Sequence, residues 1–345
     1  MEALMKRFFN IIATVYNTEK YLQEFIDSIV EQSCNDWKLI LINDGSKDGS
    51  LKVCLNNKEL YGEKIEIINS DNKGSLHARR LGVKELDCEY VLFLDSDDKL
   101  RRDALEKIKK ATERSQPDIV FFNYEKENCK DYFQLPIKPD ELFYEEGLSC
   151  IKSIILGKTR RYNQLWTKAF KSKIIDYTNI EFYERYIDQK KGTDLLQLLP
   201  LIDAAKTGVY IDEKLYFYRT NNCGISYTYN EKQFTYVKTL GLYRLWYGKR
   251  WNVCKGNICH INLMEVYEVI KTLVCSQDKL KSQKIEEIKR ISNSYYYRYI
   301  KRYNVTDNKK IWIISFLITY KIYVGIVVGM MIYDAISNIK EKYIK

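Results

Sequence analysis

YVLFLDSDD, residues 90–98, joins an apolar run to a cluster of carboxylates and decides the fold class predicted for the whole chain. A short apolar run that ends in polar turn residues is typical of a buried strand. Along an extended chain, side chains i and i+2 point to the same side, so Asp95 and Asp97 can converge on one point. Two such carboxylates repel each other, and we therefore expect a cation between them.

Other apolar, β-rich runs lie on both sides of this stretch, and helical patterns separate them. The predicted strands cover Phe8–Val15, Trp37–Ile42, Ile65–Ile68, Tyr90–Leu94 and Ile119–Phe122, and helical patterns cover Tyr21–Val30, Ser75–Leu86 and Arg102–Thr112. Strands that alternate with helices form a mostly parallel sheet with helices on both faces. The sequence therefore predicts the α/β class with a Rossmann-like sheet.

Polar loops follow the first four predicted strands. They cover residues 16–18, 43–50, 71–74 and 95–98, and they are rich in carboxylates, amides and glycine. Ligands of such sheets bind beyond the carboxyl ends of the strands, where these loops meet. A single D-x-D sequence is a weak signal, but four such loops at one sheet edge predict one binding site.

The residue types in these loops suggest a nucleotide ligand with a metal ion. The oxygens of Asp95 and Asp97 suit Mg²⁺ or Mn²⁺ shared with a diphosphate. Asp44 can accept hydrogen bonds from a base or ribose, and Arg79 can face a phosphate or order the acidic loops. The alternatives are an Asp-rich turn that caps a helix, an Asx turn, and a surface arginine.

The formal net charge of +10 is unevenly distributed over the 345 residues. Residues 1–225 carry 35 basic and 37 acidic side chains, whereas residues 226–345 carry 21 and 9, a net charge of +12. The basic residues of the last third cluster around an apolar stretch instead of alternating with aromatic side chains on a soluble module. This arrangement argues against nucleic-acid binding.

Residues 311–333, IWIISFLITYKIYVGIVVGMMIY, form that apolar stretch and carry a single charge, at Lys321. The stretch is long enough to span a bilayer, but a central lysine costs about 3 kcal/mol on insertion, and both flanks are basic. We expect an in-plane or re-entrant helix pair, hinged near Lys321 or Gly325, on a membrane surface. A helix packed in a homo-oligomer or against another domain, and a true membrane span, are the alternatives.

The N-terminal sequence and the cysteines bear on the compartment. Residues 1–17 lack the long apolar core of a signal peptide, and nine cysteines are an odd number. Both features favour reduced thiols. Together with the basic flanks, they predict a location on the cytoplasmic side of the cell membrane.

Four ordered motifs make the sequence resemble glycosyltransferase family 2, whose members have the GT-A fold. The motifs are IIATVYN at residues 11–17, LINDGSKDGS at 41–50, NKGSLHAR at 72–79 and LFLDSDD at 92–98. Further along, LWTKAF at 165–170 resembles the family's tryptophan–lysine segment, GTDLL at 192–196 its Glu-Asp motif, and YRTN at 218–221 its closing Tyr-Arg segment. The resemblance covers about residues 8–226.

The resemblance implies a role for each matching residue. Asp194 is the general base, Asp97 binds the metal, Trp166 and Thr193 face the acceptor, and the sugar nucleotide contacts Thr14, Tyr16, Asn17, Asp44, Arg79, Asp95 and Ser96. Thr14 replaces a common proline, Thr193 the usual glutamate, and Arg80 the usual asparagine. Asp194 can also cap a helix, and Trp166 can pack in the core.

The resemblance therefore implies an inverting, metal-dependent glycosyltransferase that uses Mn²⁺ or Mg²⁺ and a sugar nucleotide, with a UDP-sugar favoured. The expected acceptor is a saccharide, carried on a polyprenyl lipid, in capsule, exopolysaccharide or other surface glycan synthesis. Residues 1–225 would form the catalytic domain, with a nucleotide-binding half (1–125) and an acceptor half (126–225), and residues 226–345 a helical basic region. A sugar nucleotidyltransferase and a non-catalytic membrane scaffold on the same fold are the alternatives.

Overall fold

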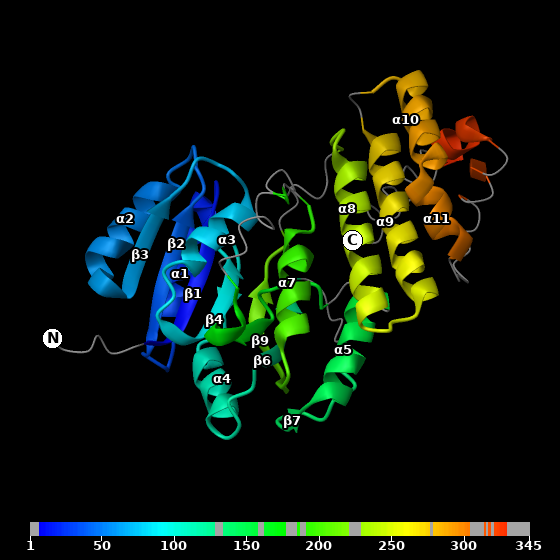
Figure 1. The fold of residues 1–345 in the computed structure, drawn as a ribbon. Helices are drawn as coiled ribbons and strands as arrows, with labels where there is room; N and C mark the ends of the chain where they lie inside the picture. Colours follow the sequence, from blue (N-terminus) through cyan, green and yellow to red (C-terminus); the bar gives the residue numbers. More distant parts are fainter. Residues whose placement is uncertain are drawn as a thin grey trace. The chain divides into compact units, whose positions relative to one another are not determined.

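The computed structural model describes residues 7–127, 134–157, 162–176, 185–186, 191–220, 229–276, 279–303, 314, 317–318 and 321–329. The chain forms two compact units (Figure 1). Unit 1 comprises Met1–Lys152 and Arg161–Asn221, and unit 2 comprises Ser153–Arg160 and Asn222–Lys345. The domain boundary predicted between residues 225 and 226 lies outside the described residues.

Four parallel strands form the first half of the sheet in unit 1. They are β1 (Arg7–Val15), β2 (Trp37–Asn43), β3 (Ile65–Asn69) and β4 (Cys88–Asp95), in the order β3-β2-β1-β4. All four are predicted by the sequence. The register places Thr14 of β1 beside Asp95 of β4, so the loops that follow these two strands start side by side.

The second half of the sheet mixes strand directions. β8 (Lys168–Lys171) runs antiparallel between β4 and β6 (Ile119–Lys126), and β9 (Gly208–Tyr218) is parallel to β6. The two-residue strands β5 (Lys99–Leu100) and β7 (Leu142–Phe143) pair antiparallel with β9. The sequence does not predict β8, because four residues are too few to show a period. The predicted α/β class with a mostly parallel sheet is confirmed.

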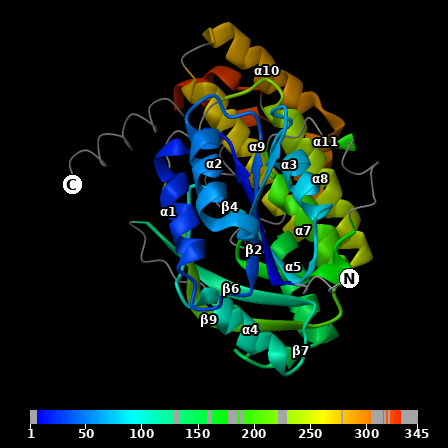
Figure 2. The ribbon, with the colours of Figure 1, turned by 90° about the vertical axis from the view of Figure 1, so that its left-hand side faces the viewer.

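Helices of unit 1 cover both faces of the parallel strands, with α1 and α3 on opposite sides in Figure 2. The helices are α1 (Glu19–Val30), α2 (Ser50–Tyr61), α3 (Ser75–Val83), α4 (Ala104–Glu113) and α7 (Thr193–Ala204), with short 3-10 turns at Gly62–Lys64 and Ser172–Ile174. Helix α5 (Glu145–Gly157) is divided between the two units.

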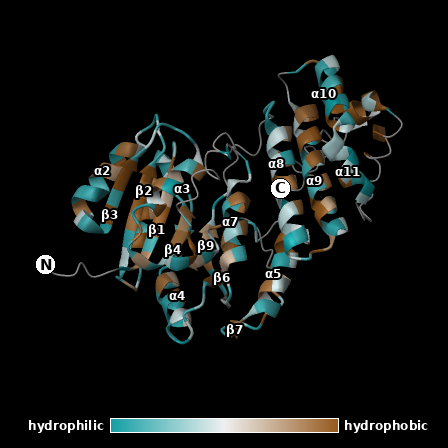
Figure 3. Cartoon of the chain, in the orientation of Figure 1, coloured by the Kyte–Doolittle hydropathy of each residue, from teal (hydrophilic) through white to brown (hydrophobic). Residues whose placement is uncertain are grey.

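Alternating strand residues explain why helices lie on both faces. Ile11 of β1 belongs to the core that includes Phe25 of α1, whereas its neighbour Ile12 contacts α3 at Gly82. A Cβ atom at Gly82 would lie 2.8 Å from Ile12, so glycine lets α3 approach the sheet closely. Figure 3 colours these strands as hydrophobic, as expected for strands buried on both faces.

In the described part of unit 2, four long helices share one apolar core. They are α8 (Gln233–Arg250), α9 (Lys255–Cys275), α10 (Lys281–Asn293) and α11 (Tyr295–Tyr303). Leu263 and Ile270 of α9 lie in this core with Phe234 of α8 and Ile300 of α11. The predicted helical C-terminal extension is therefore confirmed for these residues.

The predicted apolar stretch 311–333 is described at residues 314, 317–318 and 321–329. Three of its side chains are buried in the core of unit 2 and three are 40–50% exposed: Ile318, Ile326 and Val327 in the first group, and Ile322, Val324 and Val328 in the second. Lys321, at the predicted hinge, has a left-handed backbone with φ of 56°. Among the described residues, no helix combines the length and apolar character needed to cross a bilayer.

Candidate functional site

Loops from neighbouring strands meet at the carboxyl edge of the parallel sheet and are hydrogen-bonded to one another. Thr18 Oγ1, after β1, lies 3.0 Å from Ser96 Oγ, after β4. The backbone N–H of Asn17 donates to Ser46 Oγ, after β2, at 3.2 Å, and the backbone N–H of Lys47 donates to Asn17 Oδ1 at 2.8 Å. The fold therefore assembles the loops in which the sequence predicts one site.

Asp44 connects the second loop to the third. Its side chain is buried, and its two carboxylate oxygens accept the backbone N–H groups of Lys73 at 2.9 Å and Gly74 at 2.8 Å. Gly74 has φ of 90°, a conformation that favours glycine. Each carboxylate oxygen keeps a second lone pair. Asp44 thus holds the start of α3 in place and can still accept a hydrogen bond from a ligand.

Arg79 of α3 lies between two carboxylates that come from different elements. Its Nη1 donates to Asp194 Oδ1 at 2.7 Å, and its Nη2 donates to Asp95 Oδ1 at 3.1 Å. Arg79 is buried, whereas the side chains of Asp95 and Asp194 are 32% and 27% exposed. Asp194 is 115 residues from Arg79 in the sequence, so the fold alone brings these groups together.

Carboxylates outnumber the arginine in this cluster. Burial lowers the pKa of Arg79, but Asp194 and Asp95 outweigh that effect, so its pKa stays above the ordinary value. Burial raises the pKa of Asp95; Arg79 opposes the rise, and the carboxylates of Asp194 and Asp97 add to it. Burial, together with Asp95 and Asp97, raises the pKa of Asp98 to about 8. Burial and neighbouring carboxylates thus disfavour the charged forms of Asp95 and Asp98, and a cation among them would stabilise those forms.

Two residues at the end of β9 hold the acidic loop, and the sequence assigned a role to neither. The Tyr216 hydroxyl donates to Asp98 Oδ2 at 2.7 Å, and the backbone N–H of Arg219 donates to Asp98 Oδ1 at 2.8 Å. Arg219 Nε donates to the carbonyl oxygen of Asp97 at 3.0 Å. Asp98 is 1% exposed, so it anchors the loop from inside. The sequence signals were the third carboxylate of the loop, which needs donors from elsewhere if buried, and the YRTN stretch at residues 218–221 that contains Arg219.

Thr14, Tyr16 and Ser96 lie where β1 and β4 end. The Ser96 hydroxyl is buried and donates to the carbonyl oxygen of Thr14 at 2.8 Å. The side chain of Thr14 is half-buried, and Tyr16 is 40% exposed. Ser96 therefore ties the two loops together, while the ring of Tyr16 is open to a ligand.

The two predicted acceptor residues occupy different surroundings. Thr193 Oγ1 lies 3.0 Å from Ser75 Oγ, next in the chain to the pair between Asp194 and Arg79. Trp166 is 4% exposed, and its ring stacks on Tyr216 with the ring centroids 4.6 Å apart. The fold thus brings Thr193 to the cluster, whereas Trp166 reaches the acidic loop through Tyr216.

Lys168 of β8 is a buried charged group to which the sequence assigned no role. Its Nζ donates to the carbonyl oxygens of Tyr162 and Gln164 at 3.0 and 2.6 Å, and to Thr167 Oγ1 at 2.9 Å. Burial lowers the pKa of Lys168 to about 7, and Asp194 acts in the opposite direction. Three acceptors match the three hydrogens of an ammonium group. Lys168 therefore secures the turn that leads into β8.

Asp95 and Asp97 are the residues that fit a divalent cation. Within the described residues, no group of three or more His, Cys, Asp and Glu side chains could hold a metal ion. Mg²⁺, however, is commonly held by one or two carboxylates together with the phosphates of a substrate. The carboxylates of Asp95 and Asp97 influence each other, and together with Asp194 they exceed the charge of Arg79. This donor set suits a cation that is shared with a diphosphate.

Comparison with known proteins gives one family. The model of the family described as Glycosyl transferase family 2 matches residues 10–186, just over half of the chain. This range contains the loops after β1, β2, β3 and β4, together with Arg79 and the acidic residues 95–98.

Individual relatives share part of their length with the chain. Glycosyltransferase GlyA of Streptococcus pneumoniae is 28% identical over 233 residues, which are 64% of this chain and 32% of GlyA. Teichoic acid poly(glycerol phosphate) polymerase of Staphylococcus epidermidis is 41% identical over 91 residues, 26% of this chain and 13% of the polymerase. The matches thus cover less than two thirds of either relative.

A solved structure shares the fold over most of both chains. S. aureus TarS 1-349 in complex with UDP-GlcNAc has a TM-score of 0.59 and 15% sequence identity, with 95% of this chain and 92% of that chain covered. At this identity the likeness concerns the fold.

Proposed function

The chain belongs to glycosyl transferase family 2 and has the GT-A fold, and on this basis we propose that it transfers a sugar from a UDP-sugar to a saccharide hydroxyl with inversion. The observation that carries the proposal is the position of Arg79, which bonds Asp95 at the end of β4 and Asp194 at the start of α7. Arg79 thus holds a carboxylate at the sheet edge close to a second carboxylate that can act as a base, and a single displacement needs a base beside the reacting centre.

Asp194 is the proposed general base. The acceptor oxygen attacks the anomeric carbon, the bond from that carbon to the diphosphate oxygen breaks, and the hydroxyl proton moves to Asp194. The nucleoside diphosphate leaves with the electron pair of the broken bond. A base must lie within about 3 Å of the hydroxyl that it deprotonates. The bond from Arg79 goes to Oδ1 of Asp194, so Oδ2 is the oxygen that would take the proton.

The proposed donor site lies on the loops at the sheet edge. Its residues are Thr14, Tyr16, Asn17, Asp44, Arg79, Asp95 and Ser96. The exposed ring of Tyr16 and the remaining lone pairs of Asp44 support contacts with base or ribose. The burial of Trp166 and its stacking on Tyr216 support packing behind the acidic loop. Thr193 is also buried, but it is next in the chain to Asp194 and is therefore the better acceptor-side residue.

Asp97 and Asp95 would hold Mn²⁺ or Mg²⁺ together with the diphosphate of the donor. A bound ion of this kind supplies positive charge at the departing diphosphate. The residues of the chain do the rest: Arg79 offsets part of the charge of Asp95 and Asp194, and Tyr216 supports the acidic loop through Asp98.

A screen of sugar nucleotides tests the proposal. Release of nucleoside diphosphate would be measured with Mn²⁺, with Mg²⁺ and with EDTA. We expect at least one UDP-sugar to be hydrolysed only with metal, and Asp97→Ala to abolish this hydrolysis. Turnover in EDTA, or full transfer by both Asp97→Ala and Asp194→Asn, would contradict the mechanism.

We propose a surface glycan as the acceptor, extended while it is attached to a polyprenyl lipid. The support is the match to a teichoic acid polymerase. Transfer to teichoic acid fragments and to lipid-linked saccharides would be compared. Transfer to free monosaccharides at an equal rate would contradict the proposal.

We also propose that unit 2 rests on the cytoplasmic surface of the cell membrane. The support is the net charge of +12 in residues 226–345 and the exposure of Ile322, Val324 and Val328. Basic side chains near an anionic leaflet contribute about 1 kcal/mol each.

Vesicle sedimentation tests this location. We expect the protein to sediment with phosphatidylglycerol vesicles more than with phosphatidylcholine vesicles, and the triple Ser variant of Ile322, Val324 and Val328 to lose this binding. A double Ser variant of the exposed Leu55 and Leu60 of α2 is the matched control. A triple variant that binds vesicles normally but loses a dimer would favour the oligomer alternative.

A further inference from the structure

The acidic loop is fixed from outside by a residue on another element. We propose that Arg219 is a positioning residue, which holds the peptide of Asp97 so that its carboxylate meets the metal-bound sugar nucleotide. The inference rests on the proposed function, because it takes Asp97 as the metal ligand. Arg219 would then determine the affinity for the metal ion without binding the ion itself.

Arg219 is anchored on both sides of its guanidinium group. Nε donates to the carbonyl oxygen of Asp97 at 3.0 Å, and Nη2 donates to Glu24 Oε2 of α1 at 2.8 Å. The guanidinium lies over the ring of Tyr21, 4.6 Å from its centroid. The side chain is 15% exposed, so these contacts restrict it to one place. Arg219 thus connects α1 to the acidic loop.

The acidic loop needs such a donor. Within the turn itself, the backbone N–H of Asp98 reaches the carbonyl oxygen of Asp95 at 3.3 Å, which is long for a hydrogen bond. Asp98 is held by Tyr216 and by the backbone N–H of Arg219. The carbonyl oxygen of Asp97 accepts a hydrogen bond from the Arg219 side chain. Side-chain substitutions of Arg219 therefore act on Asp97 and leave the support of Asp98 in place.

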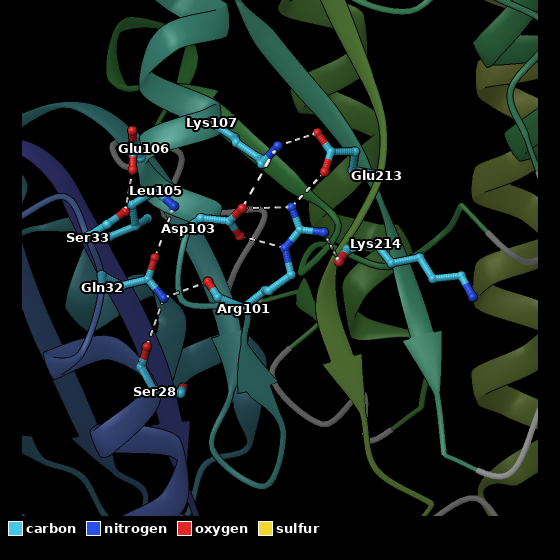
Figure 4. A network of polar contacts seen from close by, with 10 residues as sticks. All are labelled: Ser28, Gln32, Ser33, Arg101, Asp103, Leu105, Glu106, Lys107, Glu213 and Lys214. Carbon is cyan, nitrogen blue, oxygen red and sulfur yellow. Dashed lines mark hydrogen bonds and ion pairs between the residues drawn. The ribbon is translucent and has the colours of Figure 1, made fainter.

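Arg101 offers a matched control in the same unit (Figure 4). Its Nη2 donates to Glu213 Oε2 at 2.7 Å and its Nη1 to the carbonyl oxygen of Lys214 at 3.2 Å, and it also bonds Asp103. Like Arg219, it binds both a carboxylate and a backbone carbonyl oxygen. Its partners are residues of β9 and the start of α4. Arg101→Gln therefore removes hydrogen bonds like those of Arg219, but none of them reaches the carbonyl oxygen of Asp97.

The experiment measures Mn²⁺ binding to the full chain in the presence of UDP, from the electron paramagnetic resonance signal of free Mn²⁺. We expect Arg219→Gln to raise the Kd for Mn²⁺ about tenfold, and Arg101→Gln to leave it unchanged. With an active donor, Arg219→Gln should raise the metal concentration for half-maximal rate, while kcat at saturating metal changes less than threefold.

Arg219→Lys keeps the positive charge beside Tyr21 and Glu24 but has no Nε–H group for Asp97. It should raise the Kd as Arg219→Gln does, and it carries the test if the glutamine variant does not fold. A folded Arg219 variant with the wild-type Kd overturns the inference. If wild type and Asp97→Ala bind Mn²⁺ with the same affinity, the proposed function fails, and the inference fails with it.

Discussion

Two buried arginines, one in each unit, form ion pairs with carboxylates, but the number of carboxylates differs. Arg244 of α8 is 1% exposed and forms a bidentate pair with Glu265 of α9, with both bonds at 2.7 Å. Arg79 of α3 is 3% exposed and bonds one oxygen each of Asp95 and Asp194. In the first, which we call the closed pair, one guanidinium matches one carboxylate. In the second, which we call the open cluster, one guanidinium faces two carboxylates. A balanced buried pair serves the fold, and an unbalanced one is typical of a site that binds or reacts.

Asp194→Asn gives the largest expected effect on the open cluster. The substitution keeps the shape and an acceptor for Arg79 but removes the base, so transfer should fall by on the order of 10²–10⁴-fold. The measurement is kcat for transfer with the donor and acceptor found by screening. Binding of Mn²⁺ with UDP should stay within threefold of wild type, since Asp97 is intact. An unchanged kcat would show that another group takes the proton.

Arg244→Met tests the closed pair and should act on stability. The change leaves Glu265, whose side chain is 12% exposed, without its partner, which costs about 3–5 kcal/mol. Urea unfolding gives the free energy, and hydrogen exchange in α8 and α9 locates the loss. The double variant Arg244→Met, Glu265→Leu should recover most of it, because no buried charge remains. Equal losses in the single and double variants would mean that packing, and not charge, sets the cost.

Gly241→Ala tests how tightly the core of unit 2 is packed near the pair of Arg244 and Glu265. A Cβ atom at Gly241 would lie 1.7 Å from the hydroxyl of Tyr296, whose side chain is 3% exposed. Overpacking of this kind costs about 1–3 kcal/mol. Thermal unfolding should show the loss, with partial recovery in Gly241→Ala, Tyr296→Phe. Gly329→Ala is the control, because no atom of the described residues lies within 4 Å of its Cβ position. A stable Gly241→Ala protein would show that this core is loosely packed.

The contrast between the two arginines also explains what the sequence could predict. Strand-end loops and a run of carboxylates directly after a strand are local patterns, so the sheet edge and its acidic loop could be found in advance. The extended-chain argument that places Asp95 and Asp97 on one side is wrong, because β4 ends at Asp95 and the chain turns there. The pairing of Arg79 with Asp194 spans 115 residues and leaves no local signal. Arg244 and Lys168 are equally hidden, because charged residues are expected at the surface unless a partner is known.

The orientation of Asp98 could not be predicted for a geometric reason. The chain turns after Asp95, as the backbone N–H of Asp98 points back to its carbonyl oxygen. Strand alternation no longer applies there, so the third carboxylate, that of Asp98, turns inward toward Tyr216. The roles of Tyr216 and Arg219 follow from this turn and were missed with it.

Glu24→Gln gives the smallest expected effect, because Glu24 is the outer and exposed partner of Arg219. Its side chain is 52% exposed, and such pairs contribute about 0–1 kcal/mol. The hydrogen bond from Arg219 lowers the pKa of Glu24; burial opposes this effect, and the charges of Arg219 and Lys99 add to the lowering. A carboxylate with a lowered pKa stabilises the fold above its unfolded pKa of about 4.3, and this contribution is lost as the pH falls through the folded value.

Wild type should therefore exceed Glu24→Gln in stability by up to about 1 kcal/mol at pH 7, and the difference should shrink as the pH falls below 4. Urea unfolding of both proteins at several pH values measures it. The Kd for Mn²⁺ with UDP should change less than threefold, because the bond from Arg219 Nε to Asp97 remains. A tenfold change in Kd would show that the ion pair between Arg219 and Glu24 positions the acidic loop, and not the hydrogen bond from Arg219 Nε to Asp97. The position of the acidic loop would then be set by Glu24 of α1, and Glu24 would count as a member of the open cluster.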